Sequence, residues 1–169
     1  MSIPPLNFTV KLHPHPKAHT FFKYPPGGLL QLQGVVNEAE LHSPTMLNKN
    51  GEACLFVLQN SNATGATIGH ATGIESFVQE YDHHPNGYTI HTTSMELAVH
   101  PYGKVNGPFS APGDSGSVIA DPSGHIVSII TSSTGVRDSV DVTYATPYCW
   151  IQDCIKKAFP HSHFYPSSD

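Results

Sequence analysis

The most informative stretch of the sequence is Pro112-Gly113-Asp114-Ser115-Gly116-Ser117. Glycine on both sides of Ser115 allows a sharp backbone turn, from which the hydroxyl projects while backbone N–H groups converge beside it. A turn of this kind can provide a nucleophile and an oxyanion hole together. The alternative interpretation is an ordinary β-turn, in which Asp114 accepts backbone N–H groups and caps the turn.

The composition around this stretch favours one all-β domain. The chain has 169 residues, which suits a single ordinary domain, and its 15 prolines and 14 glycines indicate many turns. Only 12% of the residues are Asp, Glu, Lys or Arg, and the formal net charge is -5. Because the sequence has no basic run that could bind a phosphate backbone, we expect no nucleic-acid partner.

Other features of the sequence indicate a protein of a reducing compartment that has no membrane-spanning segment. The N-terminus lacks the basic region and apolar core of a secretory signal, and no apolar run approaches the length of a membrane span. The sequence therefore predicts a cytoplasmic protein. Cys54, Cys149 and Cys154 are an odd number of cysteines without the spacing of a zinc site, so we expect free thiols and no metal or cofactor.

Short β-rich segments separated by turn residues follow one another from Cys54 onward. Strands are predicted at Leu55–Gln59, Thr64–Thr72, Ile74–Tyr81, Tyr88–Val99, Gly116–Ala120, Ile126–Thr131 and Val140–Thr146. Closely spaced strands with such turns are typical of a sandwich or barrel. After Pro147, apolar residues at helical spacing predict a helix that ends at Pro160.

The first 50 residues differ from the rest of the chain. Prolines at positions 4, 5, 14, 16, 25, 26 and 44 interrupt most regular elements. One alternating run, residues 29–36, favours a strand. We therefore expect a Pro-rich arm over residues 1–50, a barrel with its helix over 51–160 and a tail over 161–169.

Three blocks resemble, in order and spacing, the C-terminal barrel of chymotrypsin-like serine peptidases of the PA clan. They are NATGATIG at 62–69, PGDSGS at 112–117 and SGHIVSIITS at 123–132. The chain is most similar to the streptogrisin and alpha-lytic branch and to trypsin-like proteins of fungi. The resemblance covers about residues 54–160 and implies an all-β fold, a six-stranded barrel followed by a C-terminal helix.

The resemblance also implies roles for individual residues. Ser115 would be the nucleophile of a serine endopeptidase, and the N–H groups of Gly113 and Ser115 would form the oxyanion hole. Asp114 would be a buried carboxylate that stabilises the loop. The substrate-binding residues would be Phe109, near the base of the specificity pocket, and the strand edge Thr131, Ser132 and Ser133.

The groups that would activate Ser115 are missing from their expected place. A serine hydroxyl needs a general base, and in the resembled family a histidine and an aspartate from an N-terminal barrel serve it. Here no Asp precedes Asp82, and only 53 residues precede Cys54. We therefore expect a truncated chain that is inactive alone, with the missing barrel as a partner and a peptide or protein as the substrate when that half is supplied.

Two other hypotheses stay open. The barrel could be a non-catalytic module that binds peptides, or the chain could be a complete miniature peptidase that uses His42, or His83 with Asp82. Other candidates have plainer interpretations as strand, arm or tail residues: His91, His100 and Glu96 in or beside strands; His13, His15 and His19 in the arm; His161 and His163 in the tail; Phe21, Phe22 and Tyr24 packing the arm onto the barrel.

Overall fold

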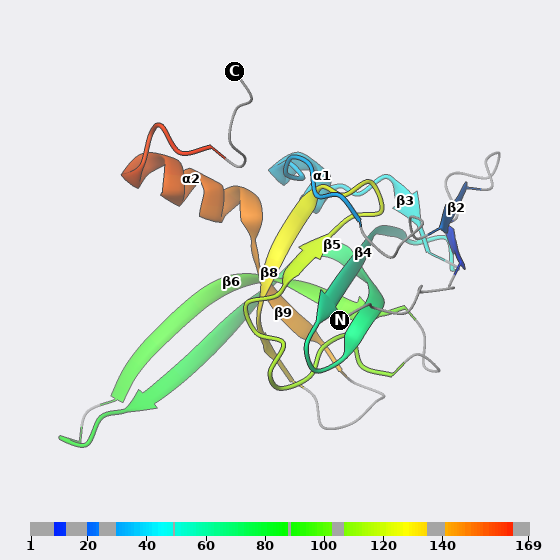
Figure 1. The fold of residues 1–169 in the computed structure, drawn as a ribbon. Helices are drawn as coiled ribbons and strands as arrows, with labels where there is room; N and C mark the ends of the chain where they lie inside the picture. The colour runs from blue at the N-terminus through cyan, green and yellow to red at the C-terminus, as the bar shows by residue number, and fades with distance from the viewer. Residues whose placement is uncertain are drawn as a thin grey trace.

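Six antiparallel strands close into a barrel in the computed structural model of the chain (Figure 1). The structure describes residues 9–12, 20–23, 30–48, 50–87, 89–102, 107–134 and 141–163. Around the barrel the strand order is β4-β5-β6-β9-β8-β7, and β7 pairs with β4 to close the ring. The strands are β4 Ala53–Ser61, β5 Gly65–His83, β6 Thr89–Pro101, β7 Val118–Ala120, β8 Ile126–Ser133 and β9 Thr143–Pro147.

The remaining elements lie outside this ring. β3 (Met46–Leu47) pairs with the first residues of β4, and β1 (Thr9–Leu12) pairs with β2 (Thr20–Lys23) in a separate two-stranded sheet. The helices are α1 (Glu38–His42) and α2 (Tyr148–Ala158). The predicted all-β barrel followed by a C-terminal helix is thus confirmed.

Strand β4 forms the centre of the core because both of its faces are covered. Side chains alternate along a strand, so Leu55 and Val57 point into the barrel and join its main apolar cluster. Cys54, Phe56 and Leu58 point outward and form a second cluster, covered by Leu30, Met46, Ile68 and Tyr102. The chain before the barrel, through Leu30 and Met46, therefore covers part of the outer side of β4.

The two strands predicted at 64–72 and 74–81 are one strand, β5, interrupted by a bulge. From Ala71 to Glu75 the register advances four residues along β5 but only two along its partner, from Val99 to Leu97. The extra residues of a bulge bend a strand without ending it. Beyond the bulge, β5 and β6 continue as a long hairpin that projects from the barrel (Figure 1).

The prediction of a strand over residues 29–36 is wrong. Residues 30–34 are irregular, and Val35 makes a single parallel bridge to Ile126. Gly34 has a φ of 69°, a left-handed conformation that breaks an extended run. The segment instead bonds to the β7–β8 turn, with Gln33 N donating to Gly124 O (2.8 Å) and Val36 N to Ile126 O (2.9 Å).

Helix α1 follows this segment directly and was not predicted. The side chain of Asn37 caps the helix by accepting the N–H of Glu40 (2.9 Å). Leu41 is the residue of α1 that is buried, in the main core cluster. Within the described residues, no helix has the length and apolar character needed to cross a bilayer.

Candidate functional site

The loop with Ser115 is attached to the end of the β7–β8 hairpin. Gly116 N donates to Ile130 O (2.8 Å) and Ile130 N donates to Ser117 O (3.0 Å), so the loop extends the pairing of the two strands. Gly113 and Gly116 have φ values of 104° and 87°, which side chains rarely tolerate. The sharp turn expected around Ser115 is therefore present, and Ser115 is exposed.

Asp114 fixes this loop to the β4–β5 turn on the opposite side. Its side chain is completely buried and accepts hydrogen bonds from Ala63 N (2.9 Å), Thr64 Oγ1 (2.8 Å) and Ala111 N (3.0 Å). Burial raises the pKa of this carboxyl, but hydrogen bonds from these groups and from Ser61 outweigh that effect and lower the pKa to about 2. Asp114 is therefore ionised at neutral pH.

A second set of hydrogen bonds supports the loop from beneath. The two N–H groups of the buried Gln59 amide are shared among three acceptors, Thr64 Oγ1 (2.7 Å), Thr67 Oγ1 (2.8 Å) and Phe109 O (2.9 Å). Thr67 Oγ1 also donates to Phe109 O (2.6 Å). The Phe109 side chain has no exposed surface and belongs to the main core cluster, so it lies within the packed barrel.

The Ser115 hydroxyl is bonded to backbone. Its Oγ donates to Thr131 O (3.2 Å), and no imidazole among the described histidines lies within hydrogen-bonding distance of it. The N–H groups of Gly113 and Ser115 donate no hydrogen bond to the described residues. Two unengaged donors thus lie in the same turn as the hydroxyl.

The edge of β8 beside Ser115 has no neighbouring strand in the described part of the chain. On this side β8 is paired up to Ile130, while on the other side its pairing with β9 continues to Ser133. Thr131 and Ser132 also line a small cavity of about 270 Å³, which Val78, Glu80, Glu96 and residues 92–94 complete. Thr131 and Ser132 therefore border open space, and Thr131 also contacts Ser115.

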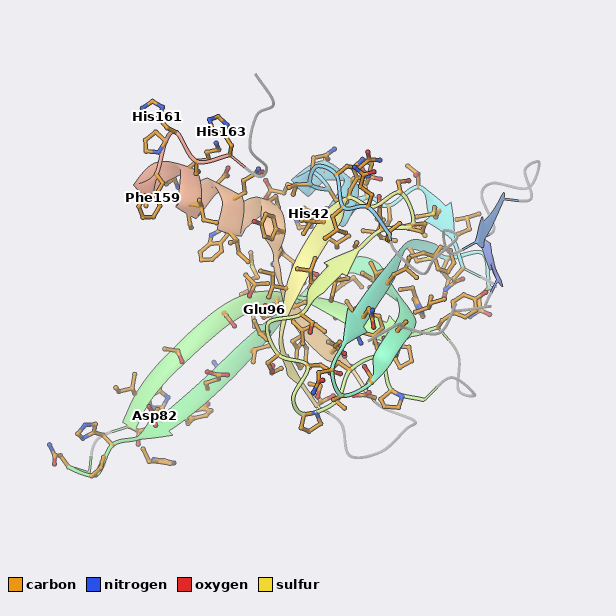
Figure 2. All side chains as sticks on the ribbon, viewed as in Figure 1. His42, Asp82, Glu96, Phe159, His161 and His163 are labelled. Atoms are coloured by element: carbon orange, nitrogen blue, oxygen red, sulfur yellow. The ribbon has the colours of Figure 1, made fainter. Side chains whose placement is uncertain are left out.

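The alternative bases are engaged elsewhere. His42 Nε2 lies 3.7 Å from Glu75 Oε1 and 3.9 Å from Glu38 Oε1. His83, next to Asp82, contacts Thr89 Oγ1 (3.0 Å) at the tip of the hairpin (Figure 2). The tip lies about seven residues along β6 from Leu97, where the hairpin leaves the barrel. This corresponds to roughly 23 Å at ~3.3 Å per residue.

The other candidates also have local partners. His91 packs edge-on against Tyr81 with ring centroids 4.8 Å apart, and His100 stacks beside His70 at 5.8 Å. Glu96 is buried and accepts a hydrogen bond from Thr146 Oγ1 (3.0 Å). His161 and His163 are exposed beyond α2 (Figure 2). The predictions for His13, His15, His19 and the packing of Phe21, Phe22 and Tyr24 lie outside what the structure describes.

The sequence reasoning missed a histidine–aspartate pair. His125 Nδ1 lies 2.9 Å from Asp121 Oδ2, whose other oxygen accepts the N–H groups of Ser123 and His125 (2.8 Å each). Asp121-Pro122-Ser123-Gly124 has the composition of a turn, and the histidine that directly follows it was a visible signal. The pair lies at the far end of β8 from Thr131, about 17 Å along the strand at ~3.3 Å per residue, so it does not serve Ser115.

The described residues include no group of three or more His, Cys, Asp or Glu side chains arranged to hold a metal ion.

No protein-family model and no curated protein matches the sequence. Among solved structures, the chain is similar to the crystal structure of Cellulomonas bogoriensis chymotrypsin, with a TM-score of 0.41 and 18% identity. The match covers 74% of this chain and 58% of that chain, so this chain spans less than two thirds of that chymotrypsin's length.

Proposed function

We propose that this barrel is a serine peptidase-like domain that carries the nucleophile and the oxyanion-hole donors but is inactive as an isolated chain. One observation supports this most strongly. Ser115 is exposed in a turn with two unengaged N–H groups, yet its hydroxyl is bonded to a backbone carbonyl rather than to an imidazole. A hydroxyl without an adjacent base attacks amides very slowly.

The proposed reaction is peptide hydrolysis through an acyl-enzyme, once a base is supplied. Ser115 Oγ attacks the peptide carbonyl carbon as the base takes its proton, and the N–H groups of Gly113 and Ser115 bind the resulting oxyanion. The base then protonates the leaving amine as the C–N bond breaks. Water, deprotonated by the same base, releases the acyl group and restores Ser115. We propose that a complementary N-terminal barrel provides this base.

The neighbouring residues have supporting roles in this proposal. Ionised Asp114 holds the loop against the β4–β5 turn, so the two N–H groups keep their direction. The free edge of β8 at Thr131, Ser132 and Ser133 accepts an extended substrate as an added strand. Phe109 has no exposed surface, so it can affect the substrate only through the residues that pack on it.

Fluorophosphonate labelling tests the proposal, because phosphonylation needs an activated serine. We expect the isolated chain to label at a rate close to that of the Ser115→Ala variant. Fast labelling that disappears in Ser115→Ala would show that the chain contains its own base. In that case His42→Ala and His83→Ala would identify which histidine acts.

The unpaired edge of β8 specifically favours a second function, the binding of peptides without hydrolysis. Backbone pairing at residues 131–133 does not require the Ser115 hydroxyl. If this is the function, the affinity for an extended peptide will be the same in Ser115→Ala, and no cleavage products will form. An affinity that falls strongly in Ser115→Ala, or any turnover, would contradict this second function.

A further inference from the structure

A larger cavity lies apart from Ser115, between α1, α2 and the base of the β5–β6 hairpin. Its volume is about 500 Å³, within the usual range for ligand sites. Apolar side chains from four elements form much of its wall: Leu41, Met95, Leu97, Pro147 and Trp150. Figure 2 shows the elements that border it, with His42 on α1 and Glu96 on β6. The following inference does not depend on Ser115.

The charged groups of this cavity are almost all of one sign. Its lining contains four carboxylates, Glu38, Glu75, Glu96 and Asp153, and, among the described residues, no lysine or arginine. His42, close to Glu38 and Glu75, is the lining residue that can become positive. A cavity of this composition attracts a cation and repels an anion.

Glu96 is the carboxylate whose surroundings point to a ligand. It is only 4% exposed, and its Oε2 accepts the Thr146 hydroxyl. Its Oε1 has no hydrogen bond from the described residues. Because the Glu96 side chain as a whole is largely covered, its interaction with a cation in the cavity is less screened by water than that of a surface carboxylate.

The exposed aromatic wall fits the same chemistry. Trp150 is 62% exposed and Met95 is 50% exposed at the mouth of the cavity, although residues of this size are usually covered. The indole face attracts ammonium and guanidinium groups, and both side chains can cover the methylene stem of a long cationic side chain. We propose that this cavity binds the lysine or arginine side chain of a partner polypeptide, flanked by apolar residues.

The single tryptophan of the chain makes this testable, because Trp150 fluorescence reports on the cavity alone. The probes are 4-phenylbutylamine, which carries the cation on an apolar stem, and the neutral 4-phenylbutan-1-ol. We expect the amine to produce a saturable change in fluorescence near pH 8, where histidine is ordinarily neutral. The alcohol should bind at least about tenfold more weakly because it lacks the charge.

Matched carboxylate variants locate the binding. Glu75→Gln and Asp153→Asn should each weaken amine binding about five- to tenfold. Asp82→Asn at the hairpin tip should leave it unchanged (Figure 2), and so should Ser115→Ala. Absence of saturable amine binding, equal affinities for the two probes, or equal losses in Asp82→Asn and Glu75→Gln would overturn the proposal. Circular dichroism of each variant verifies that it is folded.

Discussion

Asp114 is the single residue on which the geometry of the Ser115 loop depends most. Its carboxylate joins two segments that are far apart in sequence, the β4–β5 turn at Ala63 and Thr64 and its own loop at Ala111. The residue that follows it is Ser115, so any movement of Asp114 moves the hydroxyl. Hydrogen bonds between a buried charge and N–H or O–H donors are stronger than those between neutral groups.

Asp114→Asn should lower the free energy of unfolding at neutral pH by about 1–2 kcal/mol. The pKa of Asp114 is depressed from 3.8 to about 2, so the folded state binds its proton more weakly than the unfolded state. This stabilisation is fully present above about pH 4 and is lost as the pH falls toward about 2. Urea denaturation of wild type and variant between these pH values measures it.

Asp82→Asn is the control for this experiment, because Asp82 is exposed at the hairpin tip. It should change the unfolding free energy little at any pH. A difference between wild type and Asp114→Asn that stays constant down to about pH 2 would contradict the role of the charge.

At the scale of elements, the sequence predicted what depends on local pattern. The strands of the barrel and α2 follow alternation and helical spacing, and the turn at Gly113–Gly116 follows from its glycines. The structure of residues 30–42 could not be read this way. Its alternating run is interrupted at Gly34, and hydrogen bonds to the β7–β8 turn hold the segment in place. The local sequence pattern does not encode such a tertiary contact.

The sequence alone also could not predict which groups line the cavity. Glu75 and Asp153 are 78 positions apart, and they line one cavity because the bulge of β5 and the start of α2 lie beside α1. Asn37 and the acidic residues after it are a helix-start signal that could have revealed α1. His125 directly follows turn-forming residues that contain its partner Asp121, so this pairing could have been found from the sequence.

The barrel and the projecting hairpin should respond differently to the same substitution. Phe109 has no exposed surface and lies in the main core cluster, so Phe109→Ala should cost about 3–5 kcal/mol of unfolding free energy. Phe77 on the hairpin is 74% exposed, so Phe77→Ala should cost about 0.5 kcal/mol or less.

Equilibrium denaturation of both variants measures these costs, and Phe109→Leu provides a milder change if Phe109→Ala does not fold. Similar costs for Phe77→Ala and Phe109→Ala would mean that the hairpin is packed against something in solution. That result would contradict the separation of the barrel from its hairpin.

At the scale of the whole molecule, two elements leave the barrel on the same side in Figure 1, α2 and the β5–β6 hairpin. Helix α2 buries no residue, and large apolar side chains are exposed on the hairpin and on α2 or directly after it: Ile74, Phe77, Tyr81, Ile90, Met95, Trp150, Ile155 and Phe159. Exposed apolar surface of this kind is what the proposed association with a second polypeptide would cover.

The proposed function requires that the Ser115 loop has a competent geometry and lacks only a proton acceptor. Adding free imidazole to the full chain during fluorophosphonate labelling tests it most directly, because a small base can take the place of the missing one. We predict labelling that is very slow without imidazole, rises in proportion to its concentration, and is abolished in Ser115→Ala. Labelling that is already fast without imidazole and is lost in a single histidine variant, or that does not respond to imidazole at all, would contradict the account.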